Sequence, residues 1–236
     1  MFSGHQPIMR NQRLSLLNVA LILVIATSCR SASSAATPED LGKGDGTDVV
    51  AIGDSWMSYE AGTGIQDSLR KISSQPYRRY GIGGTQLLNG QIPNQYAQAK
   101  RDNPNIKTVI MTGGGNDLLR SNARVDLATA GPLTRMRIDE IADRLASLWA
   151  EMGRNGVQDI VYIFYSRGGG IAASVDYGTK KIQPICQAVK PARCHWVDSD
   201  ETLHMVLRDT THPTDEGFVA LAKTVFALMN KEGMRR

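Results

Sequence analysis

Serine, aspartate and histidine side chains stand at two turns where together they could form a nucleophile and its base. Ser55 lies in the turn Gly-Asp-Ser-Trp at 53–56, directly after an apolar run, and Asp209 and His212 are three positions apart before the last apolar stretch. A serine hydroxyl is a weak nucleophile until a base takes its proton, and a carboxylate can orient that base. These residue types therefore indicate acyl transfer. Each turn also has an ordinary explanation: a helix N-cap made by Asp54 or Ser55, or an exposed histidine beside a helix start.

Two glycine-rich turns offer groups that can stabilise an oxyanion. The turn Gly-Gly-Gly-Asn-Asp at 113–117 follows a second apolar run, and a side chain such as that of Asn116 can donate a hydrogen bond to an oxyanion. The turn Tyr-Gly-Ile-Gly-Gly-Thr at 80–85 is small enough to bring a backbone N–H close to a reacting oxygen. The alternatives are an Asn-Asp cap for the next helix and an ordinary turn.

Continuous apolar runs predict the strands that position these turns. The runs cover 48–52, 106–111 and 159–165, and a shorter one covers 195–198. Apolar runs without alternation are typical of strands covered on both faces of a parallel sheet. Ligands bind such sheets beyond the carboxyl ends of the strands, and three of these runs end there in glycine-rich or polar turns.

Helical periodicity separates the strands. Apolar residues recur at intervals of three and four over 138–152 and again over 218–229. Trp149 and Met152 belong to the first of these stripes, so core packing explains them better than a ligand site. Strands that alternate with helices predict an α/β fold, a three-layer α/β/α sandwich with a mainly parallel central sheet, over 48–232. Pro213 is expected in the first turn of the last helix.

In chain order, the four turns resemble the signature blocks of the SGNH/GDSL hydrolases: Gly-Asp-Ser, a glycine, Gly-x-Asn-Asp and Asp-x-x-His. The resemblance extends over 49–218. It implies the flavodoxin-like SGNH hydrolase fold and no cofactor. It also implies that Ser55 is the nucleophile, His212 the general base and Asp209 the acid that orients it.

The same resemblance implies an oxyanion hole. Its donors would be the backbone N–H of Ser55, the backbone N–H of Gly83 and the side chain of Asn116. Gly83 is preferred to Gly84 because of the Gly-x-Thr spacing. The second block departs from the family pattern, because Arg-Tyr stands at 79–80 where the family often has asparagine.

The implied activity is hydrolysis of a carboxylic ester through an acyl-enzyme. The substrate would be an acetylated cell-wall or plant sugar, a lipid or lysophospholipid, or a thioester, which the sequence does not distinguish. A different class is an envelope lipoprotein that binds a glycan without turning it over. The presence of both Asp209 and His212 argues against this class, because a binding protein has no need of them.

The first 28 residues predict a signal peptide. Two arginines, Arg10 and Arg13, precede an apolar run over 14–25, which is shorter than the roughly 20 residues that span a bilayer. Ala-Thr-Ser-Cys then resembles a bacterial lipobox, in which Cys29 would be acylated and attach the protein to a membrane. Ordinary cleavage near 33–36 is the alternative.

A flexible tether is expected over 29–47, where serine, alanine, glycine and charged residues show no apolar periodicity. We therefore expect an exported protein, either periplasmic, lipid-anchored to the cell envelope or secreted. Oxidising conditions would allow a disulfide between Cys186 and Cys194, which have seven residues between them. The alternative is two reduced thiols.

Composition excludes some classes of function. The 236 residues carry a formal net charge of +4, and without the two arginines of the signal segment the excess is only +2. Such an excess gives no basis for nucleic-acid binding. No cluster of histidine, cysteine and carboxylate has metal-ligand spacing, so no metal is expected. His195 and His204 have no partnering motif and are expected to be structural or surface groups.

Three further features could belong to the substrate site. Trp56 and Tyr59 either line a pocket or pack beneath the first helix. The segment 167–178, with the sequence RGGGIAASVDYG, follows a strand at the catalytic end. It either shapes access of the substrate or is a mobile loop without a contact to it.

Overall fold

The structure, a computed structural model, describes residues 45–203, 207–209 and 211–234. The expected signal peptide, Cys29 and most of the expected tether lie outside the described residues, as does His204. Within the described part of the chain, no helix is long and apolar enough to cross a membrane.

Five parallel strands form the central sheet, in the order β2-β1-β3-β4-β5. Their bounds are β1 Val49–Ile52, β2 Arg78–Arg79, β3 Thr108–Met111, β4 Asp159–Phe164 and β5 Arg193–Asp198. The four strands expected from apolar runs are confirmed, with ends shifted by at most two residues. The edge strand β2 was missed, because its two arginines form no apolar run.

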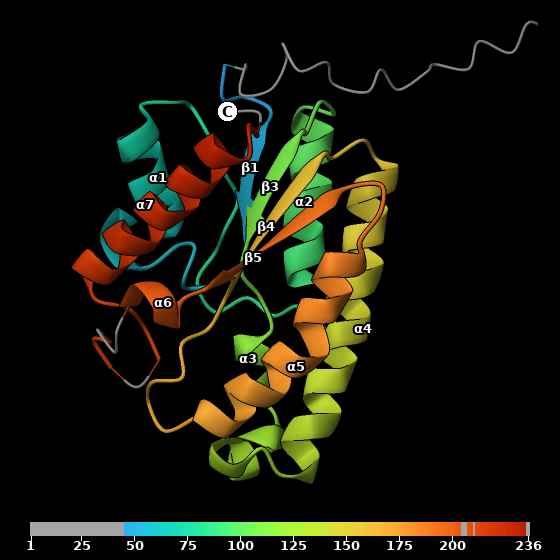
Figure 1. Cartoon of the computed structure of the whole chain (residues 1–236), viewed down its shortest axis with the longest axis vertical. Coiled ribbons are helices and arrows are strands. Elements are labelled where there is room, and N and C mark those ends of the chain that lie inside the picture. Colours follow the sequence, from blue (N-terminus) through green and yellow to red (C-terminus); the bar gives the residue numbers. More distant parts are fainter. Residues whose placement is uncertain (1–44, 204–206, 210, 235–236) are drawn as a thin grey trace, which may run out of the picture. The chain divides into compact units, whose positions relative to one another are not determined.

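Helices cover both faces of the sheet (Figure 1), which confirms the three-layer α/β/α prediction. In the figure, α1 and α7 lie on one face, and α2, α4 and α5 lie on the other. The helices are α1 Ile65–Ser73, α2 Gln91–Asp102, α3 Gly115–Leu119, α4 Pro132–Arg154, α5 Ala172–Ala188, α6 Asp200–Leu203 and α7 Asp215–Lys231. Within the described residues, the 3-10 helices are η2 Glu60–Gly62 and η3 Asn122–Thr129.

Successive apolar residues of β1, β3 and β4 enter different cores. In β1, Val50 and Ile52 pack in the core with α2, α4 and α5, whereas Val49 and Ala51 pack in the core with α1 and α7. All four are fully buried or nearly so. Because both faces of the sheet are covered, the strand sequence is apolar without alternation.

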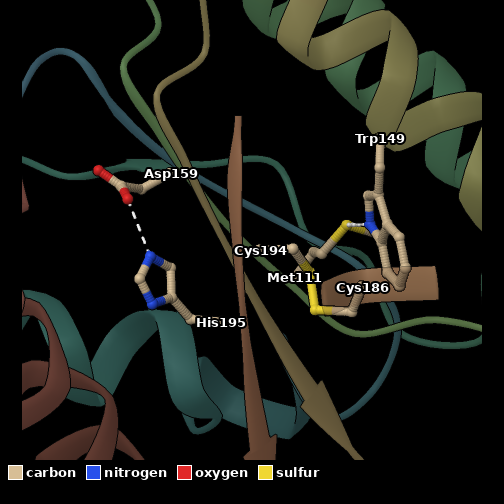
Figure 2. Close-up of a disulfide and its surroundings, with 6 residues drawn as sticks. All are labelled: Met111, Trp149, Asp159, Cys186, Cys194 and His195. Carbon is tan, nitrogen blue, oxygen red and sulfur yellow. Dashed lines mark hydrogen bonds and ion pairs between the residues drawn. A yellow bond between two sulfur atoms is a disulfide. The ribbon is translucent and has the colours of Figure 1, made fainter. Parts of the chain in front are cut away.

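The long helix α4 contains the expected helical segment 138–152. Asp126 caps its start, because its carboxylate accepts hydrogen bonds from the backbone N–H groups of Leu133 and Thr134 at 3.0 Å each. Trp149 is fully buried, and its Nε1–H points to the sulfur of Met111 at 3.3 Å (Figure 2). The assignment of Trp149 to the core is therefore confirmed.

The last helix, α7, contains the expected segment 218–229 and begins later than the position of Pro213 suggested. Its N-cap is Thr214, whose side chain accepts from the N–H of Gly217 at 3.1 Å. The prediction that Pro213 lies in the first helical turn is wrong. Pro213 instead pairs with Leu207 in an isolated antiparallel bridge, which closes the loop that carries Asp209 and His212.

A disulfide joins Cys186 of α5 to Cys194 of β5, so the bonded alternative holds in the structure. Figure 2 shows it beside Met111 and Trp149, with His195 on the same strand turned toward Asp159. His195 Nε2 lies 2.8 Å from a carboxylate oxygen of Asp159, which also pairs with Arg193. Asp159 is the first residue of β4, so this cluster lies at the amino end of the strands, away from Ser55.

Candidate active site

The turn that carries Ser55 begins at a position that only glycine can occupy. Gly53 follows β1 with a φ of +137°, and a Cβ there would collide with the side chains of Thr112 and Met57. The N–H groups of Met57 and Ser58 both donate to the carbonyl of Asp54 at 3.0 Å, which closes a single turn. The alternative that this turn is a helix N-cap is wrong, because α1 begins only at Ile65 and its N-cap is Gly64.

The buried carboxylate of Asp54 fixes this turn through hydrogen bonds. Asp54 is 1% exposed, and it accepts hydrogen bonds from the N–H of Trp56 at 3.1 Å, the hydroxyl of Thr112 at 2.9 Å and the hydroxyl of Tyr165. Burial raises the pKa of Asp54 above its ordinary value, although these hydrogen bonds oppose the shift. The carboxylate thus joins the carboxyl ends of β1, β3 and β4.

Gln95 of α2 fixes the peptide groups of Gly53. Its Oε1 accepts from the N–H of Gly53 at 2.6 Å, and its Nε2 donates to the carbonyl of Gly53 at 3.0 Å. The hydroxyl of Thr85 donates to the same carbonyl at 3.0 Å. Sequence reasoning missed Gln95, since a glutamine in an amphipathic helix carries no local signal of such a role.

Ser55, His212 and Asp209 form one chain of hydrogen bonds. Ser55 Oγ lies 2.9 Å from His212 Nε2, and His212 Nδ1 lies 2.9 Å from Asp209 Oδ2. A carboxylate can only accept, so the proton of a neutral His212 belongs on Nδ1, and Nε2 accepts from the serine hydroxyl. The structure therefore brings together three residues from positions up to 157 apart in the sequence.

The second oxygen of Asp209 is also occupied. Its Oδ1 accepts from the backbone N–H groups of Thr211 and His212 at 2.6 Å each. Burial by itself raises the pKa of Asp209, but the hydrogen bonds from His212 and the two backbone N–H groups outweigh it, so the pKa lies below the ordinary value. Asp209 is therefore ionised at neutral pH, as a group that orients an imidazole must be.

Two aromatic side chains link the loop of Ser55 to the loop of His212. The indole N–H of Trp56 donates to the carbonyl of Thr211 at 2.9 Å, and Trp56 is 2% exposed. The ring of Tyr59 lies 4.7 Å from that of His212, measured between centroids. Trp56 is therefore both packed in the core and part of a cavity wall, so both of its expected roles hold. Tyr59 lines a groove beside Ser55.

The candidate oxyanion donors lie around Ser55. A Cβ added to Gly83 would lie 3.9 Å from that of Ser55, whereas one added to Gly84 would meet the guanidinium of Arg120. Asn116 is in the first turn of α3, and its Nδ2 donates to the carbonyl of Thr85 at 3.1 Å. That bond uses one of the two amide hydrogens and fixes the plane of the amide.

Two hollows meet at Ser55. The first, here called the apolar cavity, has a volume of about 320 Å³ and is lined mainly by side chains of α3, α4, α5 and η3. The second, here called the polar groove, is open to solvent and is lined by Ser58, Tyr59, Glu60, Gly83, Gly84, Arg120 and His212. Ser55 and Asn116 border both hollows.

The segment 167–178 contributes to the apolar cavity and is not a loop throughout. Gly169, Gly170 and Ile171 line the cavity, and the helix α5 begins at Ala172. Arg167 anchors the segment through ion pairs with Asp176 and Asp200, both at 2.7 Å. The interpretation that this segment shapes access to the site agrees with this position. In the described residues, no group of three histidine, cysteine or carboxylate side chains could hold a metal ion.

Comparisons with known proteins bear on the fold. No protein-family model matches the sequence, and no curated protein matches it either. Among solved structures, Axe2, an acetylxylan esterase from Geobacillus stearothermophilus, is similar with a TM-score of 0.53 at 20% identity, over 83% of this chain and 98% of that one. The acetyl xylan esterase AlAXEase has a TM-score of 0.57 at 12% identity, over 76% and 98%.

The chain has the SGNH hydrolase fold. The five parallel strands and the near-complete coverage of the similar chains support this assignment. Two of the candidate site residues, Ser55 and Asn116, lie just beyond the carboxyl ends of strands. Ser55 follows β1 and Asn116 follows β3, as expected for a parallel sheet that binds its ligand at this edge.

Proposed function

We propose that the protein is a serine esterase that hydrolyses a carboxylic ester through an acyl-enzyme on Ser55. The observation that carries this proposal is the continuous chain from Ser55 through His212 to Asp209, with both links at 2.9 Å. Three of the similar structures are catalytic mutants of Axe2, in which a serine, an aspartate or a histidine is replaced. The aspartate and the histidine of Axe2 are three positions apart, as Asp209 and His212 are here.

In the first half of the reaction, the hydroxyl oxygen of Ser55 attacks the ester carbonyl carbon while His212 Nε2 takes the hydroxyl proton. The tetrahedral intermediate collapses, the bond to the alcohol oxygen breaks, and the alcohol leaves with the proton from His212. Asp209 keeps its charge throughout and stabilises the imidazolium. In the second half, His212 takes a proton from water, the hydroxide attacks the acyl carbon, and Ser55 is released with that proton.

The developing oxyanion requires donors that are already in position. We propose the N–H of Ser55, the N–H of Gly83 and the second amide hydrogen of Asn116 for this role. The support is local: Gly83 approaches Ser55 closely, and the hydrogen bond to Thr85 orients Asn116. Preorganised donors are effective because they do not have to reorient when the charge forms.

The substrate class that the similar structures favour is an acetylated sugar, since Axe2 and AlAXEase are acetyl xylan esterases. We also propose that the protein acts outside the cytoplasm, anchored through Cys29 or free. The disulfide between Cys186 and Cys194 supports this location, because structural disulfides are rare in the cytosol.

A phosphonate p-nitrophenyl ester tests the proposal directly. The reagent should release one equivalent of p-nitrophenol and leave one phosphonyl group per chain, which peptide mapping by mass spectrometry should place on Ser55. Ser58 lies three positions away and borders the polar groove, so it serves as an internal control for simple accessibility. Absence of labelling, or labelling at Ser58 instead, would contradict the proposed nucleophile.

Replacement of Asn116 by alanine should lower kcat about 10²- to 10³-fold, with little change in KM. The reason is that the amide hydrogen acts on the charge of the transition state more than on the bound ester. Steady-state kinetics on a p-nitrophenyl ester would measure the effect. The matched control is Asn105→Ala, an exposed asparagine before β3, which should retain full activity. A loss of less than about tenfold for Asn116→Ala would remove Asn116 from the oxyanion hole.

A further inference from the structure

The two hollows at Ser55 differ in chemistry, and this difference indicates which hollow binds the acyl half of the ester and which binds the alcohol half. We infer that the apolar cavity binds the acyl chain and that the polar groove binds the alcohol, so that the protein prefers esters of medium-chain acids. This inference rests on the proposed esterase function. It differs from the acetyl ester that the similar structures favour.

The position of His212 gives the first step. In an acyl-enzyme mechanism the base returns its proton to the leaving alcohol, so the alcohol must lie on the side of the histidine. His212 borders the polar groove and does not line the apolar cavity. Ser55 and Asn116, which act on the carbonyl group itself, border both. The acyl chain is therefore directed into the apolar cavity.

The lining of the apolar cavity gives the second step. Its walls include Leu118, Leu119, Ile138, Ile171, Val175 and Ile182. Arg124, an exposed residue of η3, also lines the cavity, whereas the buried polar side chains around it already have partners. The carboxylate of Asp54 binds Tyr165 and Thr112, the hydroxyl of Tyr162 donates to the carbonyl of Gly113, and the hydroxyl of Ser174 donates to the carbonyl of Leu127. Away from Arg124, a polar ligand would lose its hydration without finding free side-chain partners, whereas a hydrocarbon chain would lose nothing.

The size of the apolar cavity gives the third step. Its volume is about 320 Å³, and an apolar cavity of about 150 Å³ is enough for a six-carbon ring. An acetyl group would leave most of the space empty. A linear chain of about eight carbons is a closer match in volume to a cavity of this size.

The polar groove suits an alcohol with several hydroxyl groups. Glu60 and Arg120 are exposed charged side chains, and Ser58 and Tyr59 add hydroxyl groups, within a surface that is open to solvent. These groups can donate to and accept from hydroxyls, as a sugar or glycerol moiety would require. The substrate class is thus a medium-chain acyl ester of a polyol.

A series of p-nitrophenyl esters from acetyl to decanoyl tests the acyl assignment, because the alcohol stays constant. Each methylene buried in the cavity should raise kcat/KM about three- to fourfold, up to about octanoyl. A maximum at acetyl, or equal rates along the series, would overturn the inference and leave the esterase proposal intact. Failure to hydrolyse any ester of the series would instead contradict the esterase proposal.

Narrowing the cavity should change the chain-length preference. Val175 is 5% exposed and lines the cavity from α5, so Val175→Phe should lower the octanoyl-to-acetyl ratio of kcat/KM at least about 30-fold. The matched control is Val125→Phe, at a residue that is 80% exposed on η3 and outside the cavity, and it should leave the ratio unchanged.

If Val175→Phe does not fold, Ile171→Phe at the half-buried cavity wall provides the same test. Turnover of the acetyl ester reports that a variant is folded. An unchanged ratio in a folded cavity variant would show that the acyl chain lies elsewhere and would overturn the inference.

Discussion

Ser55→Ala and His212→Ala should each lower kcat by about 10⁴- to 10⁶-fold, and the double variant should be no slower than either single variant. The physical reason is that the nucleophile and its base act as one unit. Without His212, the hydroxyl of Ser55 keeps its proton, and without Ser55, His212 has no proton to take. Steady-state kinetics on a p-nitrophenyl ester, with circular dichroism to establish folding, measures the effect.

The matched control for this experiment is Ser147→Ala. Ser147 is exposed on α4, outside both hollows, and its hydroxyl donates only to the carbonyl of Asp143. Ser147→Ala should therefore stay within a few-fold of the parent enzyme. Two observations would refute the assignment: activity of Ser55→Ala within tenfold of the parent, or losses that multiply in the double variant.

Asp209→Asn should lower kcat about 10³- to 10⁴-fold while the protein keeps its fold. The remaining carbonyl oxygen of an asparagine can still accept from the backbone N–H groups that Asp209 Oδ1 now binds. Its amide group would then face His212 Nδ1 as a donor. This geometry favours the imidazole tautomer with the proton on Nε2, which cannot accept the proton of Ser55.

Asp215→Asn is the matched control for Asp209. Asp215 lies in the first turn of α7, six positions after Asp209. Its side chain pairs with Arg208 and is 60% exposed. It should change kcat by less than about twofold, because exposed ion pairs contribute little. Equal activity of Asp209→Asn and Asp215→Asn would remove Asp209 from the catalytic chain.

The sequence predicts the sheet best where the physical requirement is local. A strand covered on both faces is apolar along most of its length, so β1 and residues 160–164 of β4 can be recognised from composition alone. The edge strand β2 is only partly buried, so its two positions need not be apolar and are occupied by arginines. Similarly, the helical pattern after His212 predicted α7 but not its first residue, because the N-cap depends on the side chain of Thr214.

The residue types and the order of the four turns, which include Ser55, Asn116 and the Asp209–His212 pair, can be identified without the structure. Local spacing sufficed for these, because each turn follows or precedes an element with its own periodicity. The sequence also left the acyl and alcohol halves of the substrate undecided.

The contacts that hold the turns, and the space around them, depend on the packing of distant segments. Gln95 binds Gly53 across 42 positions, and Tyr165 binds Asp54 across 111. The apolar cavity is assembled from α3, α4, α5 and η3, whose apolar residues resemble any core-facing stripe. Contacts between distant segments leave no local pattern in the sequence. A leucine contributes to the same apolar stripe whether its side chain packs against another side chain or lines a substrate cavity.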